Sequence, residues 1–325
     1  MSGAQAFVSL AADLDFDVVT LGEAMLMLVA DEPGPLEDVQ TFHKRTAGAE
    51  TNVAIGLARL GLKVGWASRL GSDSMARYLL RELQGEGVDC DQVTCVAGQR
   101  TGFQFKGRVT DGSDPPVEYH RAGSAASLMS ARDVDADWLR RSRHLHVTGV
   151  FPALTESTLA ATRKAVATMR SAGRTVSFDP NLRPTLWPSP DAMRATLNAL
   201  ASECDWVLPG AEEGRFLTGH ARPERIAAHY RESGAKLVVV KLGAQGAYFD
   251  GEDGSGYVPA CPVARVLDTV GAGDGFAVGV ISALLEGRPV AEAVKRGAWI
   301  GARAVQVLGD TEGLPTRQQL AEQAL

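Results

Sequence analysis

The feature that most constrains the fold is an alternation of apolar runs and amphipathic segments from about residue 145 onward. The apolar runs are typical of buried strands, and the segments between them space their apolar residues as helices do. The strand-like runs are HLHVTGV, TVSFDPN, WVLPG and KLVVVKLG, and the helix-like segments are 155–172, 191–202, 212–217 and 223–233. This order predicts an α/β fold whose mostly parallel sheet is covered by helices on both faces. Ligands of such folds bind at the carboxyl ends of the strands.

The first half of the chain adds elements of the same kind and one of a different kind. Strands are predicted at Phe16–Gly22 and Lys63–Leu70, and helices at Asn52–Leu60 and Met75–Gln84, while residues 1–15 form a tail. The segments 101–109 and 117–121 alternate in polarity and are joined by the turn sequence DGSDPP. They predict a β-hairpin. A hairpin set between α/β units is a candidate for a small lid sheet.

Bulk properties narrow the class of protein. The 325 residues carry a net charge of −6, which does not favour a nucleic-acid partner. The four cysteines include no C-x-x-C pair, as expected of reduced thiols in a cytoplasmic protein. No apolar run approaches the ~20 residues of a membrane-spanning helix. The N-terminal residues also lack the basic start of a signal peptide. We therefore expect a cytoplasmic protein without a membrane partner.

The strongest local signal is the segment DTVGAGDGFAVGV at residues 268–280. Residues 263–267 are strand-like and residues 276–286 have a helical pattern, so the glycines are predicted at a strand-to-helix turn. Gly271, Ala272 and Gly273 leave their backbone N–H groups open to close approach. At a helix N-terminus these groups form an anion hole suited to a transferred phosphoryl group.

Asp274 lies in the same turn and has two interpretations. Its carboxylate can accept a proton from an attacking hydroxyl, a role that an acidic residue plays in kinases. Alternatively, it caps the helix with no catalytic role. The chain contains no G-x-x-x-x-G-K-[ST] sequence, so a P-loop kinase is excluded.

A second helix start with glycine lies at residues 46–61, TAGAETNVAIGLARLG. Gly48 and Ala49 permit close backbone approach, and Asn52 offers a donor and an acceptor to a hydroxyl-rich ligand. The alternative is helix capping by Thr51 or Asn52, which the local sequence favours when taken alone.

Together, the two glycine segments resemble the signatures of the ribokinase-like (PfkB) carbohydrate kinases. They lie more than 200 residues apart in the order that this family requires. The resemblance covers residues 16–315 and implies a single ribokinase-like catalytic domain with lid segments at 23–46 and 101–121. It implies Asp274 as the catalytic base, with the anion hole at Gly271, Ala272 and Gly273.

The same resemblance implies ATP and Mg²⁺ as cofactors. The nucleotide site would then include Asn181, Lys241, Gly243, Gly246, Gly271 and Gly273. Glu213 would match the glutamate of the family's N-x-x-E motif, which organises Mg²⁺ through water. The position of the motif's asparagine is occupied here by Gly210, which leaves the metal arrangement open although Glu213 is retained.

Within the family, two further segments resemble those of the 2-keto-3-deoxygluconate kinases: EYHRAGSAAS at 118–127 and DPNLRPTLW at 179–187. This resemblance implies phosphorylation of the terminal hydroxyl of a sugar acid. Tyr119, Arg121 and Arg183 would hold the substrate's carboxylate, because guanidinium groups match carboxylates in bidentate geometry. The remaining substrate-binding candidates are Gly48, Ala49, Asn52, Gln104 and Asp310.

Two alternatives stay open: a neutral-sugar kinase of the fructokinase or ribokinase type, and a sugar- or nucleotide-binding regulator without turnover. The predicted partner is therefore a small molecule. Lid strands with exposed edges often pair between subunits, so we expect a homo-oligomer, a dimer or larger.

Overall fold

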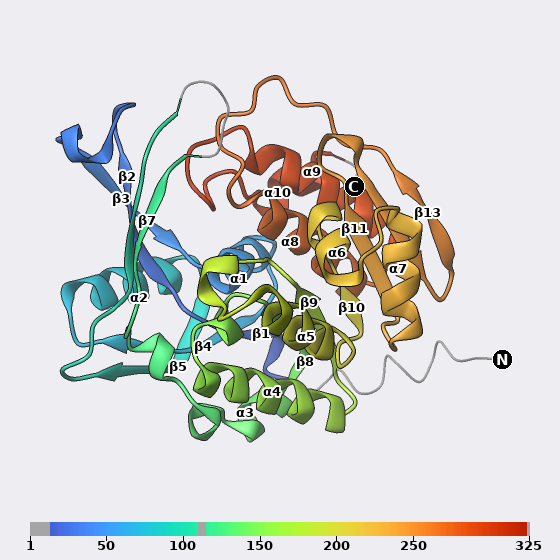
Figure 1. The fold of residues 1–325 in the computed structure, drawn as a ribbon, viewed down its shortest axis with the longest axis horizontal. Helices are drawn as coiled ribbons and strands as arrows, with labels where there is room; N and C mark the ends of the chain where they lie inside the picture. Colours follow the sequence, from blue (N-terminus) through green and yellow to red (C-terminus); the bar gives the residue numbers. More distant parts are fainter. Residues whose placement is uncertain (1–13, 110–114, 324–325) are drawn as a thin grey trace.

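The computed structural model describes residues 14–109 and 115–323, and in them nine strands form one large sheet in the order β13-β12-β11-β10-β9-β8-β1-β4-β5 (Figure 1). From β11 to β5 neighbouring strands are parallel, and β12 and β13 add an antiparallel hairpin at one edge. The strands are β1 (Phe16–Leu21), β4 (Val64–Gly71), β5 (Val88–Val96), β8 (Ser142–Thr148), β9 (Thr175–Asp179), β10 (Trp206–Val207), β11 (Leu237–Lys241), β12 (Ala247–Gly251) and β13 (Gly254–Val258). The predicted, mostly parallel sheet is confirmed.

Helices cover both faces of this sheet because alternate strand residues are apolar on both sides. Val239 packs into the core of one face, and its neighbours Val238 and Val240 pack into the core of the other. The first core contains α1 (Ala49–Arg59), α2 (Ser74–Gly85), α8 (Ala272–Leu285), α9 (Val290–Ala304) and α10 (Arg317–Ala321). The second contains α3 (Ala136–Arg140), α4 (Glu156–Ser171), α5 (Pro190–Ala201), α6 (Ala211–Thr218) and α7 (Pro223–Glu232).

A separate small sheet has the order β3-β2-β6-β7 and lies at the end of the molecule away from β13 (Figure 1). Its strands are β2 (Met25–Ala30), β3 (Phe42–Ala47), β6 (Phe103–Lys106) and β7 (Val117–His120). They come from the two segments predicted to form a lid, and β6 and β7 pair as the predicted antiparallel hairpin. The DGSDPP turn falls largely on residues 110–114, outside the described residues, as does most of the predicted tail. The oligomer stays a prediction.

The predicted strand at 263–267 is wrong. This segment has no regular secondary structure, and Leu267 N–H donates instead to the carbonyl of Val305, just beyond α9, at 2.8 Å. Pro262 precedes the segment, and Arg265 and Val266 are exposed. The segment is therefore not the buried strand that its apolar residues suggested. Sequence reasoning also missed β5, whose VDCDQVTCV is too polar for a buried strand, and the glycine-rich hairpin β12-β13.

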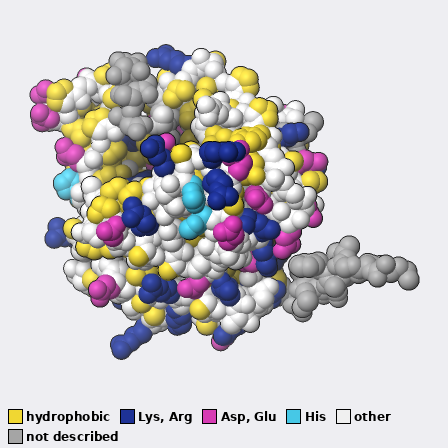
Figure 2. Space-filling model, turned by 45° about the vertical axis from the view of Figure 1, so that its right-hand side comes forward, with side chains coloured by type: hydrophobic (Ala, Val, Ile, Leu, Met, Phe, Trp, Pro, Cys, Tyr) yellow, Lys and Arg dark blue, Asp and Glu magenta, His cyan; other side chains and the backbone are white. Residues whose placement is uncertain are grey.

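The surface carries charges of both signs. On the face shown in Figure 2, Lys and Arg side chains lie among Asp and Glu side chains rather than in a separate basic patch. Within residues 14–109 and 115–323, no helix combines the length and apolar character needed to cross a bilayer.

The contact between α8 and α9 depends on a glycine. A Cβ on Gly279 would lie 2.4 Å from the backbone nitrogen of Gly297, so Gly279→Ala forces the two helices apart. We expect a loss of about 1–3 kcal/mol in the free energy of unfolding, measured by urea titration. Gly85→Ala is the matched control, because a Cβ there meets no atom within 4 Å and alanine favours the helix. Equal stability of the two variants would contradict this packing.

Candidate active site

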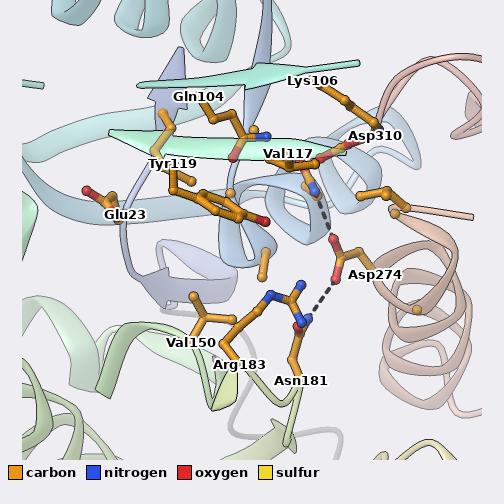
Figure 3. Close-up of a pocket in the computed structure, with 18 of the residues that line it drawn as sticks. Glu23, Gln104, Lys106, Val117, Tyr119, Val150, Asn181, Arg183, Asp274 and Asp310 are labelled. Atoms are coloured by element: carbon orange, nitrogen blue, oxygen red, sulfur yellow. Dashed lines mark hydrogen bonds and ion pairs between the residues drawn. The ribbon is translucent and has the colours of Figure 1, made fainter. Parts of the chain in front are cut away.

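A cavity of about 430 Å³ opens at the carboxyl ends of β1, β8, β9 and β11 and is bordered by the small sheet. It brings together residues from segments far apart in the sequence (Figure 3). Fourteen predicted site residues line it: Gly48, Ala49, Asn52, Gln104, Tyr119, Arg121, Asn181, Arg183, Glu213, Lys241, Gly271, Gly273, Asp274 and Asp310. This location agrees with the expectation that ligands of a parallel sheet bind at the carboxyl ends of its strands.

The glycine turn starts α8 at one wall of the cavity. Gly271 is the N-cap with φ 83°, and a Cβ there would lie 2.6 Å from the carbonyl oxygen of Asp310, so only glycine fits. The space beside Gly273 is open, since the nearest atom to a Cβ there is Lys241 Nζ at 3.5 Å. The first amides of a 14-residue helix therefore face the cavity with room for an anion.

Asp274 is a buried carboxylate in the first turn of α8, and its hydrogen bonds come from outside that helix. Asn52 Nδ2 donates to its Oδ2 at 2.8 Å and Asn181 Nδ2 donates to its Oδ1 at 3.4 Å (Figure 3). Burial raises the pKa of Asp274 to about 8, against the lowering effect of the Asn52 hydrogen bond; Asp179 and Asp310 raise it further and Lys241 lowers it. These contacts favour the catalytic interpretation over helix capping.

The second helix start supports this carboxylate. Gly48 is the N-cap of α1 with φ 151°, and a Cβ there would lie 2.5 Å from the carbonyl oxygen of Glu23. Asn52 lies one turn into the helix, and its side chain binds Asp274 rather than capping α1. Its Oδ1 is buried and makes no hydrogen bond, so the amide has a free acceptor beside the cavity.

Asn181 reaches Asp274 through an unusual backbone. Among the described residues it is the one non-glycine with positive φ, at 39°, and its N–H donates to Asp179 Oδ1 at 3.2 Å. Asparagine tolerates this left-handed conformation better than most residues. The bend after β9 directs the Asn181 side chain back toward α8.

Most charges in the cavity are paired. Lys241 Nζ lies 2.5 Å from Asp179 Oδ2, and Arg121 holds Glu23 with Nη2 and Nε at 2.5 and 2.7 Å. Burial opposes the charge of Lys241, but the carboxylates of Asp179, Glu213 and Asp274 together outweigh it and raise the pKa of that ammonium. Arg183 differs: in the described part of the chain it has no acidic partner, and its Nη1 donates to the carbonyl of Leu182 at 2.9 Å.

Glu213 lies in the first turn of α6, where two backbone N–H groups bind its carboxylate. Its Oε2 accepts from Gly210 N–H at 2.7 Å and its Oε1 from Leu182 N–H at 2.9 Å. Gly210 is the N-cap of α6, and it binds Glu213 through its backbone N–H. Glu213 therefore keeps this hydrogen bond without an asparagine side chain at position 210. Across residues 14–109 and 115–323, no group of three or more His, Cys, Asp or Glu side chains is arranged to hold a metal ion.

Three predicted residues do not line the cavity: Ala272, Gly243 and Gly246. Gly246 has a packing role, since a Cβ there would lie 2.0 Å from the carbonyl oxygen of Val258 on β13. Sequence reasoning missed Glu23, Lys106 and Asp179 as cavity residues. Glu23 and Asp179 lie at the ends of predicted strands, where ligands of such folds bind. Lys106 lies two residues after Gln104 on a strand, so both side chains were expected on the same face of the small sheet.

Comparison with known proteins places this site in a family. The model of the pfkB family carbohydrate kinases matches residues 15–317. The chain belongs to this family. It is 48% identical to a 2-dehydro-3-deoxygluconokinase of Bacillus subtilis over 309 residues, covering 95% of each protein.

Two solved structures of related proteins share the fold. A PfkB protein from Polaromonas sp. JS666 is 68% identical, with a TM-score of 0.88 over 94% of this chain and 99% of that one. A protein described as a ribokinase II from Escherichia coli, in complex with ATP and Mg²⁺, is 29% identical, with a TM-score of 0.87 over 94% of this chain and 98% of that one. The predicted ribokinase-like fold and carbohydrate kinase family are therefore confirmed.

If Asp274 is the catalytic base, its raised pKa predicts a defined pH dependence for this kinase. A base with a pKa of about 8 is active when deprotonated, so kcat/KM should rise with pH and level off above about 8. Asn52→Ala removes a hydrogen bond that lowers this pKa, so the rise should move to higher pH. Asn198→Ala is the control, because the Asn198 amide donates to the Leu217 carbonyl away from the cavity. This variant should leave the pH of the rise in kcat/KM unchanged. An unshifted profile in Asn52→Ala would contradict the assignment.

Asp274→Asn should abolish base catalysis while keeping the shape of the side chain. We expect kcat of this kinase to fall by about 10²–10⁴-fold, the range for loss of a general base. Calorimetric titration with ATP should show binding close to that of the parent protein. Asp253→Asn, at an exposed acid, is the control. Near-normal turnover of Asp274→Asn would remove Asp274 from the mechanism.

Proposed function

We propose that this kinase transfers the γ-phosphoryl group of ATP to the terminal hydroxyl of 2-dehydro-3-deoxy-D-gluconate, giving the 6-phosphate. The observation that carries the proposal is the presence of Arg183, a guanidinium without an acidic partner among the described residues, in the same cavity as Asp274. The 48% identity to a 2-dehydro-3-deoxygluconokinase supports the same substrate.

In the proposed reaction, Asp274 accepts the proton of the sugar hydroxyl as its oxygen bonds to the γ-phosphorus. The bond from that phosphorus to the bridging oxygen breaks, and ADP leaves with the electron pair. The amides of Gly271 and Gly273 line the cavity at the positive end of α8, where they would stabilise the charge on the transferred group. The protein thus supplies a proton acceptor and fixed dipoles rather than a covalent intermediate.

The sugar's carboxylate is proposed to bind at Arg183 and Tyr119, whose side chains both point into the cavity (Figure 3). Arg121 lies behind Tyr119, its guanidinium 5.9 Å from the ring centre, and it is already engaged by Glu23. Arg183 is therefore the primary ligand for the acid in this proposal, with Arg121 and Tyr119 completing its surroundings. A carboxylate held there orients the distant hydroxyl toward Asp274.

Residues for Mg²⁺ and the ATP phosphates are proposed on the main-sheet side. Mg²⁺ usually keeps several waters and takes one or two carboxylates plus substrate phosphates, and Glu213 is a carboxylate that lines this side of the cavity. Glu213 keeps lone pairs free for metal-bound water after its two backbone hydrogen bonds. When bound, the ion would neutralise phosphate charge, and Asn181 and Lys241 would face the phosphates. The Escherichia coli relative described with ATP and Mg²⁺ supports this pair of ligands.

The alternatives differ in substrate or in turnover. A fructokinase- or ribokinase-type enzyme would prefer a neutral sugar, and a binding regulator would consume no ATP. The deciding experiment measures ATP consumption with 2-dehydro-3-deoxygluconate, gluconate, fructose and ribose, and locates the phosphate by ³¹P and ¹³C NMR. A higher kcat/KM for a neutral sugar would overturn the proposed substrate, and no turnover with any sugar would favour the regulator.

Arg183→Ala tests the proposed acid site. A charge-assisted hydrogen bond contributes about 1.5–3 kcal/mol, so KM for the sugar acid should rise by roughly ten- to a hundredfold. KM for a poorly used neutral sugar should change little. Arg215→Ala, at an exposed arginine paired with Glu212 on α6, is the matched control. If Arg183→Ala weakened acid and neutral sugars equally, the arginine would not be reading the carboxylate.

A further inference from the structure

Lys106 is a buried lysine at the end of β6 and has no role in the proposed phosphoryl transfer or sugar binding. Along β6, Phe103 and Phe105 lie on the outer face of the small sheet, where their rings pack against each other and His120. Gln104 and Lys106 are buried on the inner face and line the cavity. The strand's alternation therefore sends an ammonium group from the small sheet toward the glycine turn (Figure 3).

The ammonium group lies between two carboxylates of the main domain. Lys106 Nζ is 2.6 Å from Asp268 Oδ2 and 3.0 Å from Asp310 Oδ1, and the three side chains are at most 5% exposed. Burial opposes the lysine's charge, but Asp310 and Asp268 outweigh it and raise the pKa of Lys106. The group is therefore a fixed positive charge, and without it two buried carboxylates would face each other unpaired.

Both carboxylates belong to the loops that shape the anion hole. Asp268 accepts hydrogen bonds from Val270 N–H at 3.1 Å and Gly309 N–H at 3.3 Å, so it joins the glycine turn to the loop after α9. The backbone of Asp310 packs against Gly271, the N-cap of α8. The position of the turn that carries the anion hole and Asp274 thus depends on Asp268 and Asp310 remaining together.

We infer that Lys106 is a positioning residue: its charge, carried by the small sheet, holds the Asp268 and Asp310 loops together and thereby fixes the anion-hole amides and Asp274. The ammonium group comes from the small sheet. The anion hole is therefore assembled only when the small sheet contacts the loops of Asp268 and Asp310. Lys106 contacts Oδ1 of Asp310, and both residues line the cavity. The inference does not depend on which sugar is phosphorylated.

The test separates charge from volume at this position. Lys106→Met fills the space without the charge, Lys106→Arg keeps a charge, and Lys106→Ala leaves a space that an ammonium ion fits. We expect Lys106→Met to lower kcat by about 10²-fold, the scale for misplaced catalytic groups, with a smaller change in KM for ATP. Lys106→Arg should recover part of kcat. Ammonium or methylammonium chloride should restore kcat of Lys106→Ala with saturation, whereas tetramethylammonium chloride at equal ionic strength should not.

A packing role predicts the opposite order: Lys106→Met would then be nearly normal, Lys106→Ala the worst, and ammonium without effect. That result would overturn the inference. Lys44→Met is the matched control, since Lys44 is on β3 of the same sheet but exposed. A second readout needs no sugar: amide hydrogen exchange at residues 268–274 should be faster in Lys106→Met than in Lys44→Met, with equal exchange in β8 and β9. Equal exchange at 268–274 in the two variants would also overturn the inference, whatever substrate is used.

Discussion

The cavity is organised around the buried carboxylate of Asp274. A carboxylate with a pKa of about 8 is costly to keep charged in the interior, so it needs donors fixed by the fold. Those donors come from Asn52 and Asn181, which lie 222 and 93 residues away in sequence. Three helix or strand ends must therefore meet at one point, and the parallel sheet achieves this by bringing all its carboxyl ends to one edge.

The surrounding charges follow from the same constraint. Several carboxylates line this cavity, and Asp179 and Asp310 both raise the pKa of Asp274. Lys241 therefore pairs with Asp179, Arg121 with Glu23, and Lys106 with Asp268 and Asp310. Arg183 stands outside this pattern among the described residues. An arginine left without an acid in a cavity of paired charges is available for an anionic ligand.

The sequence predicted well whatever depends on local pattern. Strands such as Leu237–Lys241 and the glycine turn before α8 carry their signals within a few residues, because burial on both faces and positive φ each restrict composition. The sequence prediction failed where a strand depends on pairing with a distant neighbour. The polar strand β5 was missed although it pairs with β4, and the apolar segment 263–267 was predicted as a strand although it forms none. The ion pairs of Lys106 and Arg121 were also beyond reach, since they join residues 204 and 98 positions apart.

The division between the two sheets explains why the cavity needs both. The main sheet and α8 hold Asp274, Asn181 and the anion hole, while the small sheet supplies Gln104, Tyr119 and Lys106. In the proposed reaction both sets are needed, because the proposed base Asp274 belongs to the main-sheet side and Gln104 and Tyr119 belong to the small sheet. Ion pairs gain strength as water leaves, so contact between the sheets strengthens the bonds that Lys106 makes across their boundary. If Lys106 positions the glycine turn as we infer, exclusion of water, which protects a phosphoryl group from hydrolysis, and placement of that turn depend on the same contact.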